Sequence, residues 1–128
     1  MAGADVAYIE RVKARELQTI RNRRAQYSPL HPPIDPAGRI VIVVDDGLAT
    51  GSTMLAALHA LRQRAPLKLV CAVPVAPPDT LEKVADKADE VVCLTAPENF
   101  QAVGQFYADF GQVEDEEVIA LLSERKKP

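Results

Sequence analysis

The sequence predicts an α/β protein built on a parallel sheet, and three observations carry that prediction. Apolar runs at residues 40–44, 68–75 and 91–94 have the length and composition of buried strands. An apolar helical pattern follows the first run and stops before Pro66, and a second one follows the next run. Strands that alternate with helices at this spacing are typical of parallel sheets with right-handed crossovers.

The first run, Ile40–Val44, consists of five consecutive aliphatic residues, which predicts a strand buried on both faces. Asp45 and Asp46 follow at its carboxyl end. A loop of small residues then opens directly into a helix from about Met54. Backbone N–H groups and hydroxyls therefore converge on the positive end of a helix dipole, which predicts a phosphate site. The loop residues concerned are Gly47, Thr50, Gly51, Ser52 and Thr53.

Two adjacent carboxylates and a phosphate loop suit a ribose phosphate. The carboxylates can accept both vicinal ribose hydroxyls and lie near positive charge at the anomeric carbon, while glycine lets the backbone approach the phosphate. Asp46-Gly47 alone is a common hairpin dipeptide, but a helix rather than a second strand follows it here. A nucleotide P-loop is disfavoured because no lysine follows Gly51.

Residues 40–53 as a whole resemble the phosphoribosyl-pyrophosphate motif of the type I phosphoribosyltransferases. In that motif a hydrophobic run and two acidic residues precede a Thr-Gly-x-Thr-like loop, which is Thr50-Gly51-Ser52-Thr53 here. The resemblance implies a three-layer α/β sandwich with a parallel sheet. We therefore expect a single phosphoribosyltransferase-like domain over residues 1–128.

Within that domain we expect a basic helix over 5–26, a mobile proline-rich loop over 27–38 and an α/β core over 39–122. Nothing before Ile40 has the pattern of the strand and pyrophosphate-holding loop with which the family begins. We therefore expect an amino-terminally incomplete domain that lacks the first strand or strands. Either the chain is part of a longer polypeptide, or a homo-oligomer covers the exposed sheet.

The segment from Pro97 to Phe110 is similar to the carboxyl-terminal part of purine-type members. That similarity implies that Phe100 stacks on the base and that Asp109 contacts a magnesium ion or pyrophosphate. Simple aromatic packing explains the same cluster equally well. Ala49 stands where hypoxanthine-guanine members carry an aspartate, which argues against 6-oxopurines and leaves the accepted base open.

The resemblance implies an enzyme that transfers phosphoribosyl to or from a nitrogenous base, with phosphoribosyl pyrophosphate or a nucleoside monophosphate as ligand and Mg²⁺ as cofactor. Asp45 and Asp46 would be catalytic and would contact the metal. The 5′-phosphate would bind to Ala49, Thr50, Gly51, Ser52 and Thr53. The alternative is a non-catalytic regulatory domain that binds phosphoribosyl pyrophosphate. A receiver-like domain is disfavoured, because Val75 and Leu94 end the later strands without a further aspartate or lysine.

The composition limits the possible partners. A net charge of −3 argues against a general nucleic-acid binder, although residues 5–26 are basic. The apolar runs are far shorter than the roughly 20 residues that span a bilayer, so we expect no membrane partner and a cytoplasmic location.

Overall fold

The computed structural model describes residues 2–27, 29 and 32–124. These residues form two compact units, one made of residues 1–34 with 112–128 and the other of residues 35–111. The second unit contains the sheet and every candidate site residue. Of the predicted loop over 27–38, residues 28, 30 and 31 lie outside the described residues.

The first unit contains two helices, α1 (Ala2–Tyr27) and α4 (Asp115–Glu124). The Tyr27 hydroxyl donates a hydrogen bond to Asp115 Oδ1 at 2.6 Å, and Arg23 Nε lies 3.7 Å from the same oxygen. The hydrogen bond to the Asp115 carboxylate raises the pKa of Tyr27 above its ordinary value. No helix in the described part of the chain combines the length and the apolarity needed to cross a bilayer.

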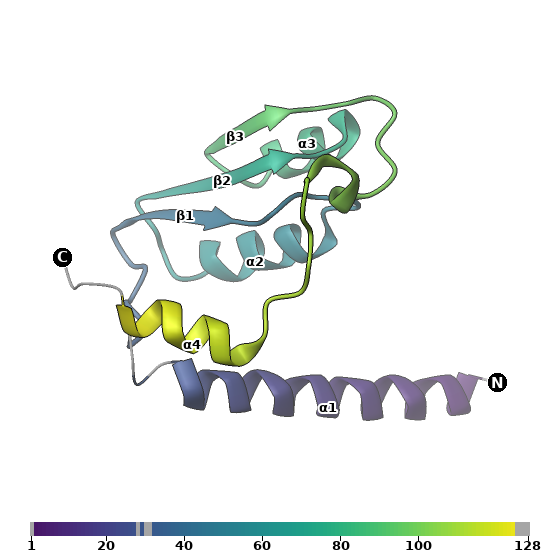
Figure 1. Ribbon diagram of the computed structural model, residues 1–128, viewed down its shortest axis with the longest axis vertical. Helices are drawn as coiled ribbons and strands as arrows, with labels where there is room; N and C mark the ends of the chain where they lie inside the picture. The colour runs from purple at the N-terminus through teal and green to yellow at the C-terminus, as the bar shows by residue number, and fades with distance from the viewer. Residues whose placement is uncertain (1, 28, 30–31, 125–128) are drawn as a thin grey trace. The chain divides into compact units, whose positions relative to one another are not determined.

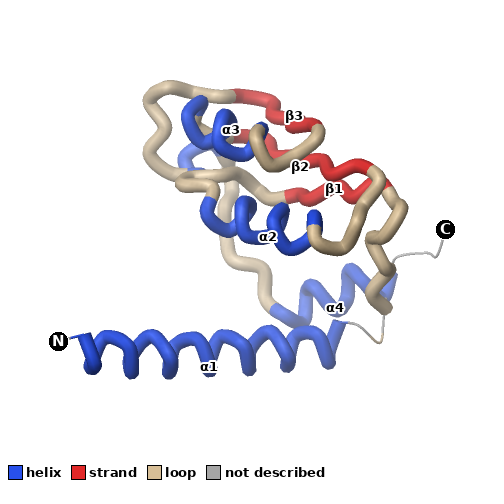
Figure 2. Tube along the Cα trace, turned by 180° about the vertical axis from the view of Figure 1, so that it is seen from behind, coloured by secondary structure: helices blue, strands red, loops and turns tan. Residues whose placement is uncertain are grey.

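The second unit is a parallel sheet with helices between successive strands, and its strand order is β1-β2-β3. Figures 1 and 2 show both helices on the same face of the sheet. This topology confirms the predicted α/β fold. The elements in chain order are β1 (Ile40–Val44), α2 (Ser52–Arg62), β2 (Lys68–Val75), α3 (Pro78–Ala85) and β3 (Glu90–Thr95).

The hydrophobic core lies between that helical layer and the sheet. Leu58 of α2 and Val84 of α3 are fully buried against Leu69 and Cys71 of the central strand. The core forms because successive residues of a strand point to opposite faces, so alternate residues of each strand meet the helices. This packing holds the carboxyl ends of β1 and β2 side by side, where the acidic residues follow β1.

The prediction that Ile40–Val44 is buried on both faces is wrong. Its alternate residues Ile40, Ile42 and Val44 are 60%, 59% and 72% exposed, as expected for an edge strand with helices on one face only. A continuous aliphatic run does not show which faces are covered, because that depends on the neighbouring layers. Within residues 35–111 two of the three expected layers are present. We call the uncovered apolar surface the open sheet face, made up of Ile40, Ile42, Val44, Val92 and Leu94.

Candidate functional site

The candidate site begins where β1 ends. The Asp45 backbone N–H donates to the carbonyl of Ala72 at 3.3 Å, and the Leu48 N–H donates to the carbonyl of Val75 at 3.0 Å. These two bonds hold the chain to β2 on either side of Asp46 and Gly47. The acidic pair, Asp45 and Asp46, therefore lies at the carboxyl edge of the parallel sheet, where ligands of such sheets bind.

The two carboxylates of the acidic pair influence each other directly. The Asp46 N–H donates to Asp45 Oδ1 at 2.8 Å. Partial burial raises the pKa of Asp46 above its ordinary value, and the negative charge of Asp45 and a hydrogen bond with it raise it further. Among the described residues, neither carboxylate has an ion-pair partner. A pair of this kind is suited to hydroxyl donors or to a cation supplied with the ligand.

The phosphate loop, Ala49–Thr53, owes its shape to Gly51. This residue is the N-cap of α2 and has φ +81°, a left-handed conformation that glycine adopts easily. A Cβ at this position would lie 2.8 Å from Thr80 Cγ2. Thr50 Oγ1 and Ser52 Oγ are 3.1 Å apart, so two hydroxyls lie together at the start of the helix. Apart from a long 3.4 Å bond from the Ser52 N–H to Thr50 Oγ1, the first N–H groups of α2 have no side-chain cap within the described residues and remain available to an anion.

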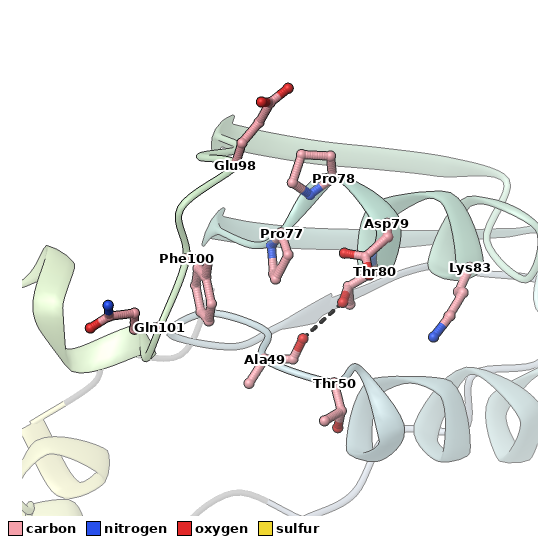
Figure 3. Close-up of a pocket in the computed structure, with 10 residues that line it drawn as sticks. All are labelled: Ala49, Thr50, Pro77, Pro78, Asp79, Thr80, Lys83, Glu98, Phe100 and Gln101. Atoms are coloured by element: carbon pink, nitrogen blue, oxygen red, sulfur yellow. Dashed lines mark hydrogen bonds between the residues drawn. The ribbon is translucent and has the colours of Figure 1, made fainter.

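Thr80 anchors this loop from the neighbouring helix. Its side chain is 3% exposed, and its hydroxyl donates to the Ala49 carbonyl at 2.8 Å, the bond drawn in Figure 3. Thr80 is not among the site residues predicted from the sequence. The only indication in the sequence is its position: Thr80 lies in the first turn of α3, shortly after β2, and the carboxyl ends of adjacent parallel strands meet at one edge of the sheet.

Two adjacent cavities surround the phosphate loop. The smaller cavity, of about 160 Å³, is lined by Asp45 and by all residues from Gly47 to Met54. Its lining therefore includes every residue predicted to bind phosphate. The larger measures about 490 Å³, within the usual range for small-molecule sites. Ala49 and Thr50 line both, so the two cavities adjoin at these residues. The larger cavity is also lined by Pro77, Pro78, Asp79, Thr80, Lys83, Glu98, Phe100 and Gln101.

Phe100, predicted to stack on a base, lies in the wall of the larger cavity. Figure 3 shows its ring directed toward Ala49. The ring also stacks on Phe106, with centroids 5.5 Å apart and planes inclined by 23°. Asp109, predicted to contact a metal, lines neither cavity, and neither does Asp46, which lies next to the smaller cavity through its neighbours Asp45 and Gly47. No three acidic, histidine or cysteine side chains are grouped for metal binding in the described part of the chain, so Asp109 does not join the acidic pair.

Comparison with known proteins identifies the family. The sequence model described as "Phosphoribosyl transferase domain" matches residues 3–110. A crystal structure of TT1426 from Thermus thermophilus superimposes with a TM-score of 0.80 and 46% sequence identity, covering 94% of this chain and 57% of that one.

Curated relatives agree with that match. Two proteins from strains of Mycobacterium tuberculosis, each named "Putative phosphoribosyl transferase", are 42% identical over 118 residues, which are 92% of this chain and 27% of each relative. A uracil phosphoribosyltransferase from Acinetobacter baylyi is 38% identical over 73 residues, covering 57% of this chain and 34% of that protein. The chain thus spans about a quarter of the length of the first relatives and about half of the solved structure. The described fold and these matches together show that the chain belongs to the phosphoribosyl transferase domain family.

Proposed function

We propose that this chain binds phosphoribosyl pyrophosphate or a nucleoside monophosphate and takes part in phosphoribosyl transfer to or from a nitrogenous base. The observation that carries the proposal is the pair of adjoining cavities, one formed by Asp45 and the phosphate loop and the other walled by Phe100. A ribose phosphate carries an anionic phosphate and vicinal hydroxyls, for which the phosphate loop and the carboxylates supply donors and acceptors.

Each part of the ligand has a matching group. The start of α2, with Thr50 and Ser52, would hold the 5′-phosphate through N–H groups and hydroxyls. Asp45 and Asp46 would accept the two ribose hydroxyls. The ring of Phe100, which lines the larger cavity, would stack on a planar base, and its contact with Phe106 would hold the ring in place.

In the proposed reaction the bond from the anomeric carbon to pyrophosphate breaks, and a bond to a ring nitrogen of the base forms. Positive charge develops on the sugar, so carboxylates fixed next to it stabilise the transition state more than the ground state. The start of α2 would hold the phosphate at a distance from the reacting carbon and fix the orientation of the ribose.

Magnesium fits the acidic pair as a cation shared with the substrate. Mg²⁺ is usually held by one or two carboxylates together with phosphate oxygens, and Asp45 and Asp46 supply such carboxylates. When bound, the ion would neutralise charge on the pyrophosphate. The raised pKa of Asp46 is consistent with a carboxylate pair that gains from a nearby cation.

One observation favours the regulatory alternative for the isolated chain. Lys83 is the only cationic residue that lines either of the two cavities in the described part of the chain, and it lies in the larger one. A leaving pyrophosphate needs donors, and loss of such electrostatic help costs on the order of a hundredfold or more in rate. We therefore propose that turnover needs further polypeptide near the acidic pair, from the same protein or a second subunit, while ligand binding does not.

Isotope exchange tests the proposal. The chain is incubated with Mg²⁺, pyrophosphate and a nucleoside monophosphate, so that pyrophosphate can displace the unlabelled base. Incorporation of labelled base into the nucleoside monophosphate is then measured beside calorimetric binding of phosphoribosyl pyrophosphate. Exchange supports transfer by the chain itself. Magnesium-dependent binding without exchange supports the regulatory alternative or the need for further polypeptide. Absence of binding contradicts both functions.

A further inference from the structure

A late segment of the chain lies directly against the acidic pair. This segment is the short 3₁₀ helix η1 (Val103–Phe106) with Tyr107. The Tyr107 hydroxyl donates a hydrogen bond to the backbone carbonyl of Asp46, which lies 61 residues earlier in the chain. A Val103 methyl group lies 2.7 Å from the position that a Cβ of Gly47 would occupy. The residues just after β1 are thus held by contacts that the strand itself does not provide.

The held peptide follows directly after the Cα atom of Asp46, so the bond from Tyr107 constrains the backbone from which the Asp46 carboxylate projects. The Asp46 N–H is bonded to the Asp45 carboxylate, and the Asp46 side chain has no ion-pair partner among the described residues. The following residue is glycine, so the Asp46–Gly47 peptide would rotate easily if its carbonyl were free. Two like charges on adjacent residues also repel each other, so the backbone that carries them needs support if both carboxylates are to stay at one site.

The phosphate loop has anchors of its own. The Leu48 N–H bonds to the Val75 carbonyl at 3.0 Å, and the Thr80 hydroxyl bonds to the Ala49 carbonyl at 2.8 Å. Neither bond involves η1 or Tyr107. Loss of the Tyr107 hydroxyl should therefore release the acidic pair and leave the phosphate loop in place.

We propose that Tyr107 is a positioning residue, whose hydroxyl holds the Asp46–Gly47 peptide so that both carboxylates face the ribose hydroxyls. This inference rests on the proposed function and extends it to a residue outside both cavities. The aromatic segment then has a role beyond packing: Phe106 supports Phe100 at the larger cavity, and the next residue orients the acidic pair. Phe106 and Phe110 are 38% and 50% exposed, so this cluster is not a conventional buried core.

The test compares Tyr107→Phe with the wild-type chain for two probes, ribose 5-phosphate and inorganic phosphate, in NMR titrations. Ribose 5-phosphate uses both the acidic pair and the loop, whereas inorganic phosphate uses the loop alone. We expect Tyr107→Phe to weaken ribose 5-phosphate binding roughly three- to tenfold, the usual effect of losing one hydrogen bond, with unchanged phosphate binding. The Gly47 amide signal should shift in the variant, because it reports the neighbouring peptide.

A matched control is Tyr27→Phe, which removes a tyrosine hydroxyl bonded to Asp115 in the other unit and should change neither affinity. If Tyr107→Phe fails to fold, Val103→Ala loosens the same segment and should produce the same selective loss. If wild type and Tyr107→Phe bind ribose 5-phosphate equally well, or if the variant loses affinity for both probes to the same extent, the role of Tyr107 is refuted. The proposed function is not affected by either result. Wild-type protein that binds inorganic phosphate but not ribose 5-phosphate would overturn the proposed function, and the inference with it.

Discussion

Carboxylates at the two ends of the same parallel sheet differ in their partners and in the direction of their pKa shifts. At the amino end, Asp89 accepts hydrogen bonds from the Leu69 N–H at 2.7 Å and from Arg62 at 3.1 Å, and these partners lower its pKa. Lys68 and Glu90, at the starts of neighbouring strands, form a second ion pair at 2.8 Å. The charges at this end join strands and helices to one another.

At the carboxyl end, the acidic pair has no such partners among the described residues, and the pKa of Asp46 is raised instead of lowered. Two carboxylates that are held close together without a cation repel each other, which lowers the free energy of unfolding. The comparison indicates that the amino end serves the fold and the carboxyl end serves a ligand. Substitutions at the two ends should therefore separate stability from binding.

The largest effect is expected from removing both charges of the acidic pair. Asp45→Asn combined with Asp46→Asn should abolish magnesium-dependent binding of phosphoribosyl pyrophosphate, because the carboxylates proposed to contact ribose and metal are gone. Thermal stability should stay near that of the wild type. Calorimetric titration measures the first property and thermal unfolding the second; unchanged affinity would refute the assignment of the pair.

A smaller effect is expected from a methyl group on one of two left-handed glycines. Gly51→Ala should cost about 1–3 kcal/mol of folding stability through backbone strain, and should also weaken phosphate binding because the new Cβ meets Thr80. Gly38→Ala is the matched control, since Gly38 has φ +69° with no atom within 4 Å of its Cβ position and lies before β1. It should lose similar stability and keep its phosphate affinity. Urea unfolding and phosphate titration provide the two readouts, and equal phosphate affinities in the two variants would contradict the loop assignment.

Next in size is the anchor between α3 and the phosphate loop. Thr80→Val keeps the shape of the side chain but leaves the Ala49 carbonyl without its partner, which should cost about 1–2 kcal/mol of stability and weaken phosphate binding. Thr19→Val removes a hydroxyl that also donates to a carbonyl, that of Arg15 in α1, and should leave binding unchanged. A crystal structure of Thr80→Val with an undisturbed loop and full phosphate affinity would show that the anchor is dispensable.

The smallest expected effects are shifts of stability with pH, and they have opposite signs at the two ends. Asp89 has a pKa below its ordinary 3.8, so its contribution is complete above pH 3.8 and is lost as the pH falls through the lower folded value. Asp46 has a raised pKa, so its unfavourable effect is absent below pH 3.8 and complete above the folded value. At neutral pH, Asp89→Asn should therefore lower the midpoint of thermal unfolding, and Asp46→Asn should leave it unchanged or raise it slightly. Both differences should shrink below pH 3.8, and a drop in the Asp46→Asn midpoint at neutral pH would contradict this electrostatic account.

Local sequence patterns were sufficient to predict the three strands and the phosphate loop. The aliphatic runs predicted three strands because apolar residues of that length favour extended, sheet-forming segments, and β1 and β2 have the predicted bounds. The residues from Ala49 to Thr53 were predicted as a phosphate loop from their small size and their place before a helix, and all of them line one cavity with Asp45. Such features depend on neighbouring residues in the chain, so the sequence carries them directly.

Other features depended on what packs against each element. The uncovered side of Ile42 and Val44, the Thr80 anchor on Ala49 and the Tyr107 bond to Asp46 all follow from segments far apart in the chain. By itself the sequence determined the three strands, the helices α1, α2 and α3 and the two carboxylates at the end of β1, because residue type sets local conformation and charge. Only the tertiary structure decided which sheet face is open, that Asp109 stays away from both cavities, and which side chains hold the site, because burial and hydrogen bonds over such separations exist only once the layers are assembled.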